Sequence, residues 1–154
     1  MALVSIFTVG RLNHPYDHPT SREFYEMGYK VMRQASVSGH LIEEFSSDGV
    51  PIPEEAKGIG YPVLTLTVWK SLQFLYQFTY SGKHIQALRN RSKWMEPSEV
   101  KHLSYVVWWT EMARDVSWEE AFRRYNHYIE HGPTPFAFDY KHPFDEKGET
   151  LSLK

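Results

Sequence analysis

Two kinds of hydrophobic pattern alternate along the chain. In the first, apolar and β-branched residues are dense or alternate with polar ones, which is typical of strands. In the second, apolar residues recur every three or four positions, which is typical of amphipathic helices. These patterns predict strands over Leu3–Leu12, His40–Ser46, Tyr61–Trp69 and Leu103–Thr110, and helices that begin near Thr20, Ser71 and Ser117.

Capping signals set the boundaries of the helices. Ser or Thr followed three residues later by Glu is typical of a capping box, and Gly is a common C-terminal stop. The signals are Thr20 with Glu23 and Ser117 with Glu120 at the starts, and Gly39 and Gly132 at the ends. The middle helix is expected to run from Ser71 to about Trp94, with a kink allowed at Gly82.

The predicted order is strand, helix, strand, strand, helix, strand, followed by a third helix. This is the order of the ferredoxin-like α+β fold, an antiparallel sheet with two helices on one face. We expect a single domain over residues 1–138 and a Pro- and charge-rich tail over residues 139–154.

The third predicted strand has two unlike faces. One face is apolar and the other is half polar with one aromatic residue; they carry Leu64, Leu66 and Val68, and Val63, Thr65, Thr67 and Trp69. A half-polar face with an aromatic residue suggests packing against a second copy rather than solvent. The sequence therefore predicts a homodimer joined through its sheets.

Composition narrows the class of protein. The chain has 154 residues, 16% of them aromatic, no cysteine and a net charge of −2. The lack of cysteine excludes disulfides, thiolate catalysis and Cys-ligated metals, and the charge argues against nucleic-acid and membrane partners. The N-terminus does not resemble a signal peptide, and no apolar run approaches the ~20 residues of a membrane span. We expect a cytoplasmic protein.

Several segments together resemble a known family. They are Val68-Trp69, Phe78 to His84, Arg91, Trp94, Trp108-Trp109 and, most specifically, the His131-Gly132-Pro133-Thr134-Pro135-Phe136-Ala137-Phe138 run. The pattern is similar to the family called domain of unknown function 3291, which is placed in the dimeric α+β barrel superfamily. The sequence departs from the family at His40, where an aromatic residue is usual, and at Met112–Val116, where a Pro- or Gly-bearing link is usual.

The dimeric α+β barrel superfamily contains enzymes whose reactions can be considered for this chain, whereas the family itself has no activity to transfer. The resemblance implies cofactor-independent monooxygenases, haem enzymes, and cyclases or isomerases as relatives, acting on hydrophobic, aromatic or polyketide-like molecules. We expect a small-molecule enzyme of secondary metabolism, with a monooxygenase-like reaction that needs no cofactor. The alternatives are a non-oxidative cyclase, isomerase or lyase, a haem-binding protein, and a non-catalytic ligand-binding module.

Tyr80, His84 and Arg91 are the predicted catalytic residues. On a continuous helix, spacings of four and seven residues place them on one face. A histidine can act as a base near pH 7, with Tyr80 as a hydrogen-bond partner and Arg91 as an anion stabiliser. The competing interpretation is that His84 and Arg91 brace the third helix or the tail.

Four further residues are predicted to line the substrate site: His40, Trp69, Trp94 and Trp108. Tryptophans supply large apolar walls, although core packing is the competing role for each. Because Trp108 and Trp109 are consecutive on a strand, they should point to opposite faces. Trp109 is expected in the centre of the sheet.

No metal site is predicted. His14 and His18 flank Asp17, but Pro15 and Pro19 favour a loop over the helix that would align two ligands. His127 and His131 lie one turn apart on the third helix, where a polar edge is the simpler interpretation.

Overall fold

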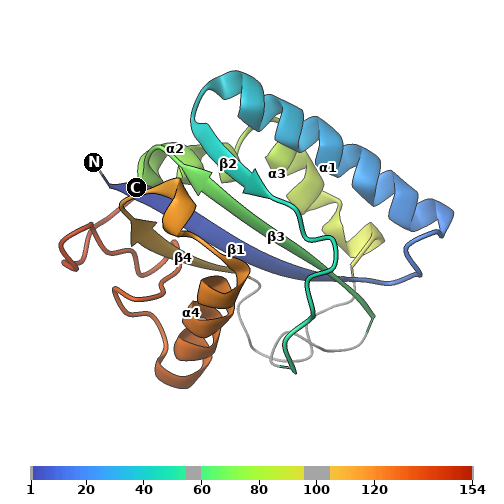
Figure 1. The fold of residues 1–154 in the computed structure, drawn as a ribbon. Helices are drawn as coiled ribbons and strands as arrows, with labels where there is room; N and C mark the ends of the chain where they lie inside the picture. The colour runs from blue at the N-terminus through green and yellow to red at the C-terminus, as the bar shows by residue number, and fades with distance from the viewer. Residues whose placement is uncertain (1, 55–59, 96–104, 154) are drawn as a thin grey trace.

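One antiparallel sheet organises the chain (Figure 1). The structure is a computed structural model that describes residues 2–54, 60–95 and 105–153. The strands lie in the order β2-β3-β1-β4, and they are β1 (Leu3–Leu12), β2 (Leu41–Phe45), β3 (Tyr61–Trp69) and β4 (Tyr105–Thr110). This topology confirms the predicted ferredoxin-like α+β fold.

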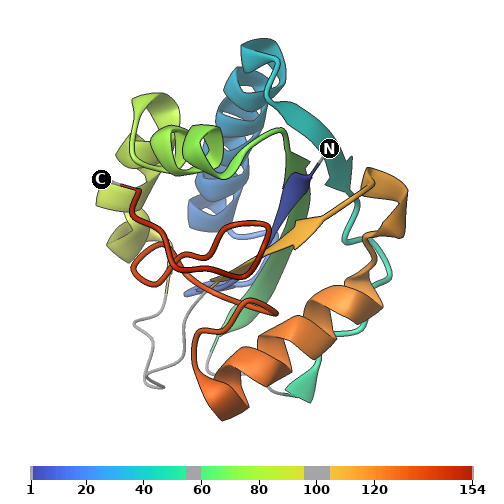
Figure 2. The ribbon, with the colours of Figure 1, turned by 90° about the vertical axis from the view of Figure 1, so that its left-hand side faces the viewer.

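Helices cover both faces of the sheet (Figure 2). Three of them lie on one face, namely α1 (Pro19–Ser38), α2 (Leu72–Thr79) and α3 (Gly82–Arg89). The opposite face carries α4 (Trp118–His131). Two short 3-10 turns are η2 (Arg91–Lys93) and η3 (Ala113–Asp115).

The first helix begins at Pro19 and is capped by His18, so it starts slightly before the predicted Thr20. His18 is its N-cap, and its Nδ1 accepts a hydrogen bond from the backbone N–H of Thr20 at 3.1 Å. Pro19 occupies the first helical position, where its missing N–H costs nothing. The capping box predicted at Thr20 is therefore wrong, whereas Gly39 ends the helix at φ 78° as expected.

The predicted continuous helix from Ser71 to Trp94 is wrong. It is divided because Ser81 is extended and Gly82 has a φ of 52°, which residues other than glycine rarely adopt. A Cβ atom at Gly82 would also collide with the side-chain amide of Gln34 in α1. The same amide accepts a hydrogen bond from Lys83 N at 2.9 Å, so α3 begins against α1 rather than along α2.

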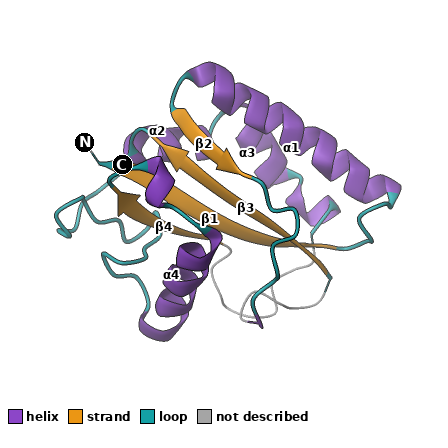
Figure 3. Ribbon diagram, viewed as in Figure 1, coloured by secondary structure: helices purple, strands orange, loops and turns teal. Residues whose placement is uncertain are grey.

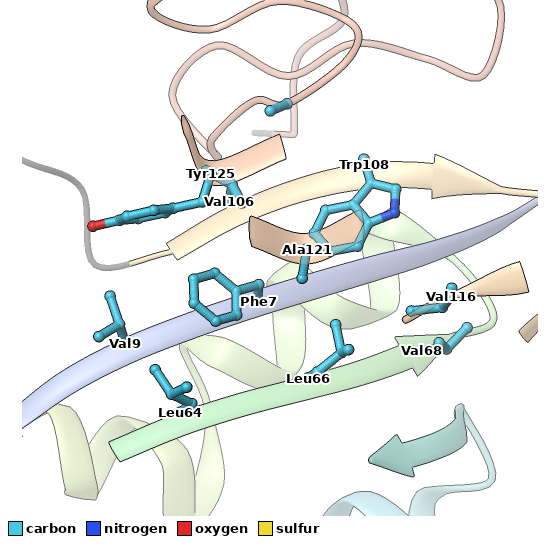
Figure 4. Packing of buried hydrophobic residues seen from close by; sticks show 11 residues of the cluster. Phe7, Val9, Leu64, Leu66, Val68, Val106, Trp108, Val116, Ala121 and Tyr125 are labelled. Carbon is cyan, nitrogen blue, oxygen red and sulfur yellow. The ribbon is translucent and has the colours of Figure 1, made fainter. Parts of the chain in front are cut away.

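The α4 face holds the larger core (Figure 4). Phe7, Leu66 and Trp108, from three adjacent strands, are fully buried there. The Phe7 ring meets Tyr125 of α4 edge to face, with centroids 5.3 Å apart. Trp118 also donates from Nε1 to the carbonyl of Ser46 at 2.9 Å, which fixes the start of α4 over the end of β2.

The chain's own helices cover part of the half-polar face of β3. Trp69 belongs to the same buried cluster as Ala35 of α1 and Leu72 and Leu75 of α2. Further along the strand, Thr65 on the same face is exposed. The apolar face lies under α4. A dimer contact through the sheets therefore stays a prediction, and it is limited to the open part of the half-polar face.

The predicted tail folds back onto the α2 side of the sheet, largely without regular structure (Figure 3). Phe138 exchanges two backbone hydrogen bonds with Val107 of β4, at 2.8 and 2.9 Å. Apolar side chains beyond it pack into the same cluster; they are Tyr140, Phe144, Leu151 and Leu153. β4 is the edge strand of the four-stranded sheet, so the prediction that Trp109 lies in the centre of the sheet is wrong. Trp109 is half-buried beside the tail, and its Nε1 donates to the carbonyl of Phe144 at 2.8 Å.

Candidate functional site

His84 lies half-buried in the first turn of α3. Its Nδ1 is 2.9 Å from the carbonyl oxygen of Thr79, and a carbonyl only accepts, so the proton is on Nδ1. Burial lowers the pKa of His84 from its ordinary value, more than the hydrogen bond raises it. At neutral pH the ring is uncharged, and Nε2 carries a lone pair.

Four tyrosines surround the neighbouring end of α2, and we call them the tyrosine cluster: Tyr76, Tyr80, Tyr105 and Tyr140. Tyr140 is at the centre, with ring centroids 5.4, 5.9 and 5.0 Å from those of Tyr76, Tyr80 and Tyr105. Tyr140 is buried, whereas Tyr80 is 49% exposed. The cluster therefore reaches from the core to the surface.

Hydrogen bonds join the tyrosine cluster to Thr79, the last residue of α2, whose carbonyl also binds His84 of α3. Thr79 Oγ1 donates to the carbonyl of Leu75 at 2.9 Å, so the Tyr140 hydroxyl is the donor in its 2.9 Å contact with Thr79. The backbone N–H of Tyr140 donates to the hydroxyl of Tyr105 at 3.1 Å. Thr79 thus binds His84 through its carbonyl and Tyr140 through its hydroxyl.

Three phenols of the cluster, those of Tyr80, Tyr105 and Tyr140, are uncharged at neutral pH. Burial raises the pKa of Tyr140 and of Tyr105 far above the ordinary value, and it also raises the pKa of Tyr80. Neighbouring phenols raise these values further, since each would repel a second phenolate. The region therefore offers neutral donors, aromatic rings and one neutral imidazole.

Arg91 does not share a helix with His84. α3 ends at Arg89, and Arg91 begins the exposed turn η2. The predicted single face of Tyr80, His84 and Arg91 is wrong because it required a continuous helix. Tyr80 instead contacts Tyr76 and Tyr140 after the last turn of α2.

The three predicted tryptophans lie in three places. Trp69 is buried beneath α2, with its centroid 4.9 Å from that of Phe78, whose ring also lies 5.7 Å from His84. Trp94 is buried against Phe24 of α1 at 6.0 Å. Trp108 is in the core under α4, on the opposite face of the sheet. Only Trp69 belongs to the surroundings of His84.

His40 precedes β2 and is not part of the strand, contrary to the prediction. Its ring stacks on Phe74 of α2, with centroids 3.6 Å apart and planes 13° from parallel. This contact attaches the start of β2 to the outer side of α2.

A second polar group was missed by sequence reasoning. Asp139, Tyr128 and His142 meet where the tail leaves β4, on the far side of the strand from the central sheet. The spacing Asp-x-x-His was a signal, but it lay within a segment assigned as an irregular tail. Asp139 is buried, and its carboxylate binds both of the other side chains.

Four further histidines of the described residues have local roles. His14 and His18 stack with centroids 4.0 Å apart, and His18 caps α1. His127 and His131 contact each other on α4 at 4.4 Å. Within residues 2–54, 60–95 and 105–153, no three His, Asp or Glu side chains are grouped so that they could hold a metal ion.

Comparison with known proteins identifies the family. Residues 3–153 match the family described as Domain of unknown function (DUF3291), so the chain belongs to it. No curated protein sequence matches the chain. The described helices are all too short or too polar to cross a membrane.

Proposed function

We propose that this member of the DUF3291 family is an enzyme that acts on a neutral, hydrophobic aromatic or polyketide-like molecule, with His84 as general base. The observation that supports this most directly is the hydrogen bond from His84 Nδ1 to the Thr79 carbonyl. It fixes the tautomer in which Nε2 is the free acceptor. A base in this state can remove a proton from an acidic C–H or O–H group.

The surroundings favour a neutral aromatic substrate over a charged one. The half-buried ring of Phe78 lies 5.7 Å from that of His84, with the buried Trp69 behind it. The tyrosine cluster is joined to His84 through Thr79. Aromatic rings bind planar apolar surfaces, and neutral phenols donate to carbonyl or hydroxyl oxygens. Tyr80, the most exposed phenol of the cluster, is the proposed hydrogen-bond partner of the substrate.

The proposed reaction is oxygenation without a cofactor. Once a base has removed a proton, an electron-rich aromatic anion can react with oxygen itself, so the protein supplies only the base and the binding surface. A non-oxidative isomerase, cyclase or lyase would use the same base. Oxygen consumption during turnover separates the two.

The test combines the state of His84 with a reaction. Long-range ¹H–¹⁵N NMR should find a neutral His84 with its proton on Nδ1 at pH 7. Anthrone is a suitable probe, because its anion takes up O₂ to give anthraquinone and water. We expect oxygen uptake above the buffer rate for the wild type and its loss in His84→Gln, with the exposed His131 of α4 changed to Gln as matched control. A protonated His84, or a proton on Nε2, would contradict the proposal.

Haem binding is a second candidate for the same side chain. An axial histidine usually donates from its other nitrogen to a carbonyl or carboxylate, as His84 does to Thr79. A Soret band that forms on haem addition and disappears in His84→Ala would favour this candidate over the base.

A homodimer stays a prediction. Since α4 covers one sheet face and α2 covers the other only around Trp69, a second copy would meet the sheet at the open part of the half-polar face, around the exposed Thr65. Light scattering at roughly tens of micromolar decides the question, and a monomer at that concentration would contradict it.

A further inference from the structure

Asp139 holds an unusual set of hydrogen bonds. Its side chain is only 4% exposed, and Oδ1 accepts from the backbone N–H groups of Lys141 and His142, both at 2.8 Å. Tyr128 donates its hydroxyl to Oδ2 at 2.6 Å. The imidazole Nδ1 of His142 lies 3.0 Å from Oδ1 and 3.3 Å from Oδ2.

The turn alone does not require this carboxylate. The two backbone bonds form an Asx-type turn, which an asparagine oxygen could make as well. The second oxygen, however, accepts from a phenol, and the imidazole approaches from the side. An asparagine in this orientation would present its NH₂ group to Tyr128, so the phenol would have to accept instead of donate, whereas a carboxylate accepts from every one of these partners and adds its charge.

The contact fixes the state of the imidazole. Since a carboxylate accepts, Nδ1 of His142 carries the proton, and Nε2 of the neutral ring carries the lone pair. The His142 side chain is 61% exposed, so its outer nitrogen lies at the surface. A buried carboxylate that orients a histidine in this way also stabilises the imidazolium formed when Nε2 takes a proton.

We propose that Asp139 and His142 form a second acid–base centre, which activates water for the hydrolysis of small esters. Bulk water reaches His142 freely, in contrast to the half-buried His84, and this favours water as the group that is deprotonated. Tyr128 is a positioning residue, because it binds Asp139 and fixes the carboxylate.

The step balances without a further reactant. His142 Nε2 takes a proton from a water molecule while the water oxygen bonds to the carbonyl carbon of the ester. The carbon–oxygen bond to the alcohol then breaks, and the imidazolium returns the proton to the leaving oxygen. The products are a carboxylic acid and an alcohol.

A second exposed histidine provides a matched control. His131 Nε2 lies 3.6 Å from the carboxylate of Glu130, but these two side chains are 55% and 73% exposed. Both pairs therefore combine a surface imidazole with a carboxylate. They differ in that only the carboxylate of Asp139 is buried and fixed by three other donors.

The experiment measures hydrolysis of p-nitrophenyl acetate at pH 7.5. We expect His142→Gln to lower the rate above buffer by about tenfold, and His131→Gln to leave it nearly unchanged. The chain has eight histidines, so equal contributions would cost about one-eighth for either variant. Equal small losses in the two variants would overturn the proposal.

A spectroscopic measurement distinguishes the proposed acid–base pair of Asp139 and His142 from a turn with a purely structural role. Long-range ¹H–¹⁵N NMR should find the proton of His142 on Nδ1 in the wild type and a shift toward Nε2 in Asp139→Ala, which removes the acceptor. In Tyr128→Phe, which keeps the carboxylate, we expect the Nδ1 tautomer and a smaller loss of rate than in His142→Gln. A wild-type His142 with its proton on Nε2 would overturn the proposal even if the variants lose activity.

Discussion

The two faces of the sheet differ in the polarity of the residues that the strands present. Under α4 the strands present an apolar surface whose central members, Phe7, Leu66 and Trp108, are fully buried. On the α1–α3 face the corresponding strand positions include Thr8, Thr65 and Thr67, and the layer above holds His84 and the tyrosine cluster. Both faces hold a buried core, and the α1–α3 face also carries the polar groups on which the proposed function depends.

This division follows from strand register. Side chains alternate between faces along a strand, so pairing of Phe7 with Leu66 puts both in one core, and pairing of Thr8 with Thr65 puts both hydroxyls on the other side. Those two hydroxyls bind each other. Thr65 is exposed, whereas Thr67 further along the strand is buried and accepts from Trp69 Nε1 at 2.9 Å, as a buried polar group requires.

The largest effect expected is at Trp108. Trp108→Ala should destabilise the protein by about 3–5 kcal/mol, because it removes the largest fully buried side chain of the α4 face. Trp109→Ala, on the other face and half-buried, should cost clearly less. Urea denaturation followed by far-UV circular dichroism measures both. Equal losses would show that the two faces contribute alike to stability.

Asp139→Asn should come next in size. Hydrogen bonds to a charged group contribute about 1.5–3 kcal/mol; the variant removes the charge and disrupts the bond from Tyr128 to Oδ2, while its oxygen can keep the bonds made at Oδ1. The measured quantity is the free energy of unfolding at pH 7. A change below about 0.5 kcal/mol would show that the carboxylate charge is not needed to hold the tail.

Most of the fold could be predicted from the sequence because local signals and tertiary contacts agree. β1 and β3 have the predicted bounds, and α4 begins at Ser117 and ends before Gly132 as the capping signals indicate. The apolar stripe of α4 identified its packed side, including Ala121 and Tyr125. Here the period of the hydrophobic pattern determined both the element and its buried face.

The errors arose where a distant contact overrides a local pattern. The apolar stripe through residues 72–88 favours one long helix, but Gln34 of α1 binds the backbone at Lys83, and the chain turns there at Gly82 with a φ of 52°, which favours glycine. The same break removed Arg91 from the predicted site. The Asp139–His142 pair was missed because a tail without periodicity gives no indication that it will fold back and bury a carboxylate.

A double-mutant cycle tests the hydrogen bond that joins Thr79, at the end of α2, to Tyr140 of the tyrosine cluster. Thr79→Val leaves the buried Tyr140 hydroxyl without its acceptor, whereas Tyr140→Phe leaves Thr79 still bonded to Leu75. We therefore expect Thr79→Val to cost more than Tyr140→Phe, with a coupling of about 1 kcal/mol between them. Additive losses would show that the two side chains do not interact in solution.

The smallest effect expected is a change in pH dependence at His84. Burial lowers its pKa in the folded protein, so the unfolded chain, with an ordinary pKa of about 6.5, binds the proton more readily. Stability from the neutral ring is then fully present above about pH 6.5 and is lost as pH falls from there through the folded pKa. The effect is modest because the ring is only half-buried and solvent screens part of it.

Two variants isolate this contribution. Neither His84→Gln nor His84→Phe can titrate, so both should lose less stability than the wild type between pH 7.5 and 5, whatever their absolute stability at pH 7.5. Urea unfolding at half-unit steps of pH gives the slopes. If the wild type and both variants lose stability in parallel, His84 has an ordinary pKa in the folded protein. Its ring would then not be desolvated. A shallower slope in both variants would place a neutral, partly dehydrated imidazole on the polar face, which is the state that the proposed base requires.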